Sequence, residues 1–229
     1  MENIGWFNFE KKDLDFPFYR KNPHVPKWGW IVFVPLILLG FLFTAGESVL
    51  SGIISCLILV VPVLYFLKWD YKAIFQKPTL REVGLAVALF VGYMIYATVV
   101  SAALGYVGIT TDGTVEQSSI NLMYILASVF SLMGEEFMKL IPFLFFMRVI
   151  FKYTNNRKLA IVVSMILVMF IFASMHAYSF ITLIFAIFVQ GFGSIFEFYG
   201  YIKTKNVFVS YLTHLITDVF IFLLVMFSI

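Results

Sequence analysis

The sequence predicts an all-α protein, a polytopic transmembrane helical bundle of about seven spans with its N-terminus in the cytoplasm. The chain has 229 residues, of which 62% are hydrophobic and only 13% charged, whereas ordinary soluble domains are about a quarter charged. Its mean hydropathy is +0.96. Apolar runs of about 20 residues, the length that crosses a bilayer as a helix, recur along the chain without the period-two alternation of a membrane β-barrel.

The apolar runs define the expected helices in order. They predict spans at about 29–46, 49–67, 83–107, 119–150, 159–178, 180–201 and 206–228. Short connections at Glu47 and at Tyr178-Ser179 predict two helical hairpins. The fourth run is longer than a bilayer requires, so we expect that helix to tilt or to project beyond the membrane.

Basic residues predict the orientation of the bundle. Loops rich in Lys and Arg alternate with loops that have none, and fifteen of the sixteen basic residues fall on one side. By the positive-inside rule this side is cytoplasmic, which places the C-terminus outside. The sixteenth basic residue, Lys139, lies inside the fourth span. A net charge of +3 is accounted for by the cytoplasmic loops, so no nucleic-acid partner is expected.

The segment 1–28 precedes the first span and is predicted to be a cytoplasmic or interfacial arm, because it lacks the apolar core of a signal peptide. We expect its aromatic side chains to rest at the lipid interface. These are Trp6, Phe7, Phe9, Phe16, Phe18 and Tyr19. Residues 29–229 are predicted to form one transmembrane helical domain. The single cysteine, Cys56, excludes an internal disulfide and a Cys-rich metal site.

Two adjacent glutamates and a lysine interrupt the fourth span in the stretch "SLMGEEFMKL". Ionisable groups at this depth cost about 2.5–3.5 kcal/mol each on insertion scales, so each needs a partner or a function. Glu135 and Glu136 are four and three residues before Lys139, a spacing that puts all three on neighbouring parts of one helical face. The lysine can neutralise one glutamate and leave the other free to hold a proton or activate water. A buried ion pair that only joins helices is the alternative.

Two other spans carry histidines. His214 and Asp218 are one turn apart in "HLITD", where the aspartate can fix the histidine tautomer or raise its basicity. In "FASMHAY", Phe172 stands one turn before His176. Taken singly, the first pair is also explained as a polar clasp between helices and His176 as an interfacial residue. Together, polar groups in three spans favour one cluster that can perform general acid–base chemistry and stabilise an oxyanion.

These residues resemble the motifs of the CPBP superfamily, which includes CAAX prenyl-protein endopeptidases, bacteriocin-processing enzymes and Abi proteins. Its motifs are EExxxR, then FxxxH, then HxxxN or HxxxD, each in a different transmembrane helix. In this chain they correspond, in order, to Glu135-Glu136, Phe172…His176 and His214…Asp218. The resemblance covers about residues 83–229, which would form the protease-like core.

The chain departs from the family pattern at two points. The family arginine would fall at Leu140, whereas Lys139 gives the EExxK pattern of the related PrsW proteases. Glu197 in "GFGSIFEF" resembles the FxxxE motif of those relatives imperfectly, because Phe192 is five residues before it. Glu197 is expected near the cytoplasmic face, either lining an entrance or as an interfacial glutamate beside Lys203 and Lys205.

The resemblance implies a glutamate-dependent intramembrane endopeptidase. Glu135, with His176, would activate the water that attacks a peptide carbonyl. Glu136 would pair with Lys139 and support the site. His214 would stabilise the tetrahedral oxyanion, with Asp218 orienting it. Phe172 and Glu197 are expected to support the site.

The expected partners are the lipid bilayer and a peptide or membrane-protein substrate, in the cell membrane of a prokaryote; the oligomeric state is left open. Zinc is an alternative, because two histidines and two glutamates can ligate it, but the family resemblance implies no metal and no HExxH spacing is present. We therefore expect no cofactor. A second interpretation is a non-catalytic immunity or scaffold protein of the same fold. A proton-coupled transporter is a third, although no pair of similar halves with broken helices is evident.

One geometric condition follows from helix lengths. His214 is nine residues after Lys205, whereas His176 is eighteen residues after Lys158, and both lysines lie in predicted cytoplasmic loops. At a rise of about 1.5 Å per residue, the two histidines would differ in depth by roughly 13 Å. A single site requires tilt, local thinning or a later start of the fifth span.

Overall fold

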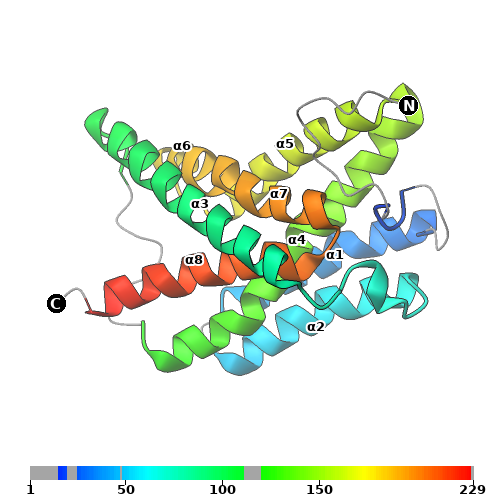
Figure 1. The fold of residues 1–229 in the computed structure, drawn as a ribbon, viewed down its shortest axis with the longest axis horizontal. Coiled ribbons are helices and arrows are strands. Elements are labelled where there is room, and N and C mark those ends of the chain that lie inside the picture. The colour runs from blue at the N-terminus through cyan, green and yellow to red at the C-terminus, as the bar shows by residue number, and fades with distance from the viewer. Residues whose placement is uncertain (1–14, 20–24, 47, 111–119, 228–229) are drawn as a thin grey trace.

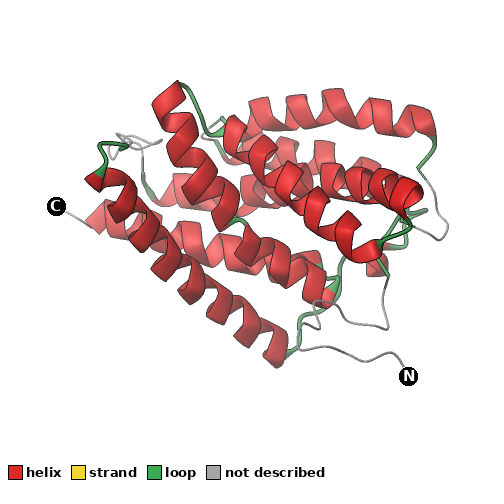
Figure 2. Cartoon of the chain, turned by 90° about the horizontal axis from the view of Figure 1, so that it is seen from above, coloured by secondary structure: helices red, strands yellow, loops and turns green. Residues whose placement is uncertain are grey.

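The computed structural model describes residues 15–19, 25–46, 48–110 and 120–227, and these ranges contain helices and no strand. The helices, shown in Figures 1 and 2, are α1 (Lys27–Thr44), α2 (Val49–Phe66), the short 3-10 helix η1 (Tyr71–Ala73), α3 (Leu80–Tyr106), α4 (Leu122–Thr154), α5 (Arg157–Met175), α6 (Phe180–Ala186), the π-helical segment η3 (Ile187–Gly191), α7 (Ile195–Thr204) and α8 (Val207–Phe227). The prediction of an all-helical bundle is confirmed.

Within the described ranges, six helical stretches are long and apolar enough to cross a membrane, and one of them, Phe180–Thr204, combines α6, η3 and α7. The remaining predicted span, the fourth, corresponds to α4, which is 33 residues long and contains Glu135, Glu136 and Lys139. The chain is therefore a multi-pass membrane protein. The predicted fourth span begins at residue 119 and the predicted seventh ends at 228, and these two ends lie outside the described residues, as does Glu47.

The long helix α4 runs through the middle of the bundle and packs against α1, α2, α5 and α8. Small residues let α2 approach it closely. A Cβ on Gly52 would lie 2.7 Å from the backbone oxygen of Ala127, and a Cβ on Gly134 would lie 2.6 Å from the Oγ of Ser55. Close approach at small residues is a usual basis of helix association in membranes. The charged stretch of α4 is thereby fixed inside the bundle.

The predicted span 180–201 is not one regular helix. It begins as α6, widens into the π-helical segment Ile187–Gly191, turns at Ser194 and continues as α7. A Cβ on Gly191 would lie 2.8 Å from the backbone oxygen of Met169, so glycine allows this segment to touch α5. π-Helical turns are frequent at functional sites, and here the turn precedes Glu197 by two helical turns.

The end of the N-terminal arm packs into the bundle, where the sequence predicted aromatic residues at the lipid interface. Phe16, Phe18 and Tyr19 are buried and belong to the hydrophobic core. Arg148 donates a hydrogen bond to the backbone oxygen of Phe18 at 3.0 Å. Burial between the helix ends removes these rings from water more completely than an interface does. Trp6, Phe7 and Phe9 lie outside the described residues.

Candidate functional site

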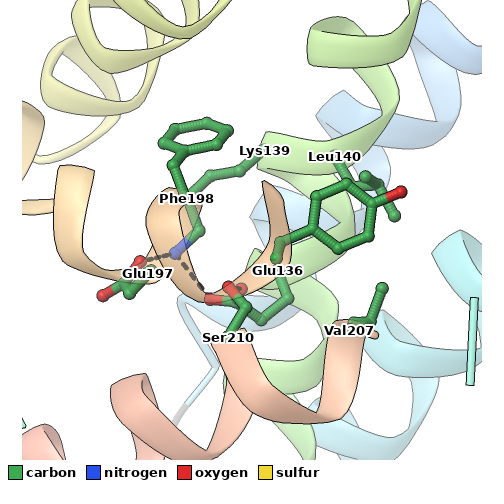
Figure 3. Close-up of a pocket in the computed structure, with 8 residues that line it drawn as sticks. Glu136, Lys139, Leu140, Glu197, Phe198, Val207 and Ser210 are labelled. Atoms are coloured by element: carbon green, nitrogen blue, oxygen red, sulfur yellow. Dashed lines mark hydrogen bonds and ion pairs between the residues drawn. The ribbon is translucent and has the colours of Figure 1, made fainter. Parts of the chain in front are cut away.

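Glu136 is the centre of a buried polar cluster that joins α4 to α8 (Figure 3). Its side chain is 4% exposed. One carboxylate oxygen, Oε1, lies 2.6 Å from the Nζ of Lys139 and 2.8 Å from the Nδ1 of His214. The hydroxyl of Ser210 donates to the other oxygen, Oε2. Three donors therefore satisfy this carboxylate, and the Glu136–Lys139 ion pair that the family resemblance implied is present.

Lys139 extends the cluster to α7, where its ammonium also forms an ion pair with Glu197. Both side chains are buried. The ammonium lies 4.8 Å from the ring centroid of Phe172 on α5, a cation–π contact. Glu197 is thus a buried member of the cluster, where the sequence suggested either an interfacial glutamate or one that lines an entrance. Its imperfect FxxxE match was the only sequence signal for this position.

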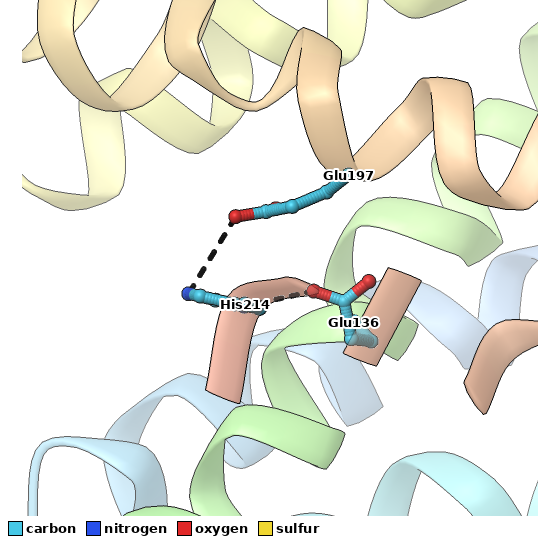
Figure 4. Close-up of side chains that lie close together, drawn as sticks. All are labelled: Glu136, Glu197 and His214. Carbon is cyan, nitrogen blue, oxygen red and sulfur yellow. Dashed lines mark hydrogen bonds and ion pairs between the residues drawn. The ribbon is translucent and has the colours of Figure 1, made fainter. Parts of the chain in front are cut away.

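The Nε2 of His214, the ring nitrogen that does not bond to Glu136, faces three carboxylates. Its Nδ1 carries hydrogen and donates to Glu136, since an ionised carboxylate only accepts. Its Nε2 lies 3.6 Å from Asp218, 3.9 Å from Glu135 and 3.9 Å from Glu197 (Figure 4 shows the last of these). These separations are too long for direct hydrogen bonds, but one water can bond to two such atoms at once.

Glu135 and Asp218 differ from the other two carboxylates of the cluster in having no lysine or arginine partner among the described residues. Lys139 pairs with Glu136 and Glu197, and only His214 is left to face Glu135 and Asp218. Their side chains are 16% and 26% exposed. The sequence prediction that the lysine neutralises one of the two adjacent glutamates therefore agrees with the geometry, and Glu135 is the one left free.

His176 lies at the end of α5, where its ring contacts Phe172. Its Nδ1 donates to the backbone oxygen of Phe172 at 2.9 Å. The centroid of the Phe172 ring is 4.5 Å from that of His176 and 6.5 Å from that of His214. Within the described residues, His176 has no hydrogen bond or ion pair with a cluster carboxylate. The histidine beside Glu135 is His214, where the family resemblance implied His176.

Because both histidine rings contact Phe172, a difference in depth of roughly 13 Å, as counted from helix rise, is excluded. The reason is the length of α4, which continues to Thr154 before α5 returns from Arg157. The α4–α5 hairpin therefore projects beyond the turn between α7 and α8. Counting from the basic loops assumed that both loops lie at one level, and this assumption was wrong.

Ser210 is a site residue that the sequence analysis missed. It is one turn before His214 on α8 and 4% exposed, and its hydroxyl bonds to Glu136. A serine in an apolar helix has many structural explanations, so no motif singled it out. The spacing of four residues from His214 was the available signal, because it puts both side chains on one face.

Replacing Ser210 by alanine is expected to lower the free energy of unfolding by about 1–3 kcal/mol, because one oxygen of a buried carboxylate loses its donor. Thr213→Val is the matched control on α8, since the buried Thr213 hydroxyl bonds only to the carbonyl of Val209 in its own helix. Thermal unfolding of the detergent-solubilised protein measures both. Nitrogen chemical shifts of His214 should also change in Ser210→Ala and not in the control. Equal effects of the two substitutions would contradict this role.

Three side chains could in principle hold a metal. Ligand atoms of Glu136, Glu197 and His214 lie within 4.8 Å of one another. However, the ammonium of Lys139 lies between the two carboxylates and 3.4 Å from the Nδ1 of His214. A zinc ion about 2.0–2.2 Å from all three ligands would have to displace it. The arrangement fits a lysine as the resident cation.

A small cavity of about 10 Å³ borders the cluster, which is close to the smallest space that holds one water. Its lining combines polar and apolar residues, namely Glu136, Lys139, Leu140, Glu197, Phe198, Tyr201, Val207 and Ser210. Five of these have polar side-chain atoms, enough to bind a water. A peptide does not fit this space, so the described conformation is closed to substrates of that size.

No family model, curated protein or solved structure matches the chain. The interpretation of the cluster therefore depends on its residues and their geometry.

Proposed function

We propose that the chain is an intramembrane endopeptidase of a prokaryotic cell membrane that cleaves a peptide or membrane-associated protein with an activated water. The observation that carries the proposal is the position of His214. Its Nδ1 is fixed by Glu136, and its Nε2 faces Glu135, a carboxylate with no lysine or arginine partner among the described residues. A carboxylate and an imidazole nitrogen 3.9 Å apart can bind one water between them, which is the arrangement that general-base hydrolysis needs.

In the proposed reaction, Glu135 takes a proton from this water while the water oxygen bonds to the peptide carbonyl carbon. The carbonyl oxygen becomes an oxyanion, and His214 stabilises it by donating from Nε2 when both ring nitrogens carry protons. The carbon–nitrogen bond then breaks, and the leaving amine receives the proton from Glu135. The water oxygen is then part of the new carboxyl group, and the proton that Glu135 took from the water is on the amine product.

The surrounding groups support this reaction by position and charge. Glu136 accepts from His214 and holds its ring, as buried carboxylates do for catalytic histidines. Asp218 lies 3.6 Å from Nε2 and favours the imidazolium. Lys139 binds Glu136 and Glu197, which keeps the cluster from carrying four uncompensated carboxylates. The ring of Phe172 packs edge-on near His214, with centroids 6.5 Å apart.

Purified protein in detergent is expected to cleave at least one member of a panel of quenched peptides, both prenylated and plain, and to keep its full rate after thorough chelation. The reason is that Lys139 supplies the cation of the cluster. A rate that falls on chelation and returns with zinc would contradict the metal-free mechanism. Cleavage of no member of the panel would favour the non-catalytic immunity or scaffold protein.

A further inference from the structure

The cluster is too enclosed to admit a peptide, because the side chain of His214 is only 7% exposed and those of Glu135 and Asp218 are 16% and 26% exposed. A helix or the arm therefore has to move before a peptide reaches His214. The cavity beside Glu136 holds no more than one water. On the side predicted to be cytoplasmic, Phe16 covers Tyr201, a cavity-lining residue, with ring centroids 5.9 Å apart. The ammonium of Lys205 lies 4.0 Å from the centroid of the same Phe16 ring. Entry from this side requires the buried arm to leave.

The helices behind the cluster are joined through backbone contacts. Gly52 brings α2 against the backbone of α4, and Gly191 brings the π-helical segment against the backbone of α5. Backbone atoms cannot rotate out of the way, and a well-packed interior resists small displacements. These walls are therefore poor candidates for an opening.

The wall formed by α3 is built differently. α3, all of which the structure describes, buries only Ala86. The buried share of its most apolar stretch is 6%, against 17% to 39% for the other five candidate spans. α3 crosses the face of α7 and α8 (Figure 1) and packs mainly against these two helices. It is the least buried of the candidate spans.

The contacts of α3 are made largely by aromatic side chains, two of which pack closely against glycines, Phe196 against Gly92 and Tyr93 against Gly193. Phe90 meets Phe220 of α8 with ring centroids 5.4 Å apart, and Tyr93 meets Phe196 of α7 at 6.1 Å. One hydrogen bond adds to these, from the hydroxyl of Tyr96 to the backbone oxygen of Phe188 at 2.6 Å. Phe188 belongs to the π-helical segment, where the widened turn leaves carbonyl groups available.

The same helix covers the reactive side of the cluster. Tyr93 contacts Phe196, the residue just before Glu197, and Phe90 contacts Phe220, two residues after Asp218. Glu197 and Asp218 are two of the carboxylates that face the Nε2 of His214. The outward face of α3 carries exposed apolar side chains, among them Val91, Ile95 and Val99. In a membrane this face meets lipid. Moving α3 away from α7 and α8 therefore opens the cluster to the bilayer and not to water.

We propose that α3 is a lateral gate and that the substrate is an apolar, membrane-embedded peptide segment that reaches His214 from the bilayer. That the entering segment is cleaved rests on the proposed endopeptidase function. The path of entry past α3 does not depend on that function and can be tested without cleavage.

The test uses a single reporter cysteine, Asp218→Cys, in a Cys56→Ser background reconstituted in lipid vesicles. Its rate of labelling is measured with a long-chain alkyl maleimide dissolved in the lipid and with a charged maleimide dissolved in water. We expect the alkyl reagent to label faster. Tyr96→Phe, which removes the bond from α3 to Phe188, should raise that rate about fivefold, the factor that corresponds to a net hydrogen bond of about 1 kcal/mol.

The control is Tyr211→Phe, because the Tyr211 hydroxyl makes an equivalent bond of 2.7 Å to the backbone oxygen of Val129, between α8 and α4. It should leave the rate unchanged. The gate is refuted if the charged reagent labels as fast as the alkyl reagent, if the alkyl reagent does not label, or if the two phenylalanine variants behave alike. Because labelling needs no cleavage, this result is separate from the peptide panel that tests the proposed function.

Discussion

Glu135→Gln is expected to lower the cleavage rate by about 10²–10⁴-fold, the usual contribution of a general base, while the protein remains folded. Glutamine has nearly the same shape as glutamate but cannot take a proton from water. The side chain is 16% exposed and has no lysine or arginine partner in the described part of the chain, so its charge contributes little to stability. Rates with a cleaved panel peptide, beside thermal unfolding of the same samples, measure both effects.

The neighbouring glutamate is the matched control for this prediction. Glu136→Gln changes the same atoms one residue along α4, but it removes a charge that accepts hydrogen bonds from Lys139, His214 and Ser210. We expect it to lower both stability and activity. Glu135→Gln protein that cleaves at the wild-type rate would remove Glu135 from the mechanism.

Lys139→Met is expected to lower the free energy of unfolding by about 3–5 kcal/mol, the range found when one partner of a buried ion pair is removed. Methionine matches most of the length of lysine but carries no charge, so Glu136 and Glu197 are left without a cation between them. The effect should appear as poor accumulation in the membrane or a lower unfolding temperature in detergent.

A second substitution tests the cause. In the double variant Lys139→Met with Glu197→Gln, one of the two stranded carboxylates is neutral, so part of the lost stability should return. Additive losses in the double variant would show that the two side chains do not interact. Such additivity would contradict the ion pair.

The fold was largely predictable because a bilayer imposes a simple rule on sequence. Each predicted apolar run corresponds to a helix or, for 180–201, to a helical stretch interrupted by η3, and the polar connection at Tyr178-Ser179 is where the sequence placed it. Helix length and apolar composition determine these elements locally. The interruption of the sixth run was not predictable in this way. It depends on Gly191 meeting the backbone of α5, a contact between distant parts of the chain.

The sequence predicted most of the residues that form the polar cluster, but not which of them contact one another. The cost of burying charge singled out Glu135, Glu136, Lys139 and His214, because each needs a reason to be inside a membrane. The spacing along α4 also predicted that Lys139 pairs with one of the two adjacent glutamates, and the family resemblance implied that this is Glu136. Which histidine stands beside Glu135 depends on how far α4 projects, and spacing along separate helices carries no such information.

Two other features could not be predicted from the sequence, for a related reason. Ser210 is an ordinary residue whose role exists only because α8 brings it to Glu136. Phe16 belongs to a short aromatic segment that is equally suited to a lipid interface, and its burial depends on the space between the helix ends that it fills. In both cases the environment, and not the residue type, determines the role.

The most direct test of the account is cleavage of a membrane-embedded peptide in isotope-labelled water, with wild-type protein and Glu135→Gln side by side and the products weighed by mass spectrometry. The account predicts a new carboxylate that carries one heavy oxygen from water in the wild-type reaction, and no product above background with Glu135→Gln. Equal product from both proteins would contradict the central claim, because the hydrolysis would then not depend on Glu135.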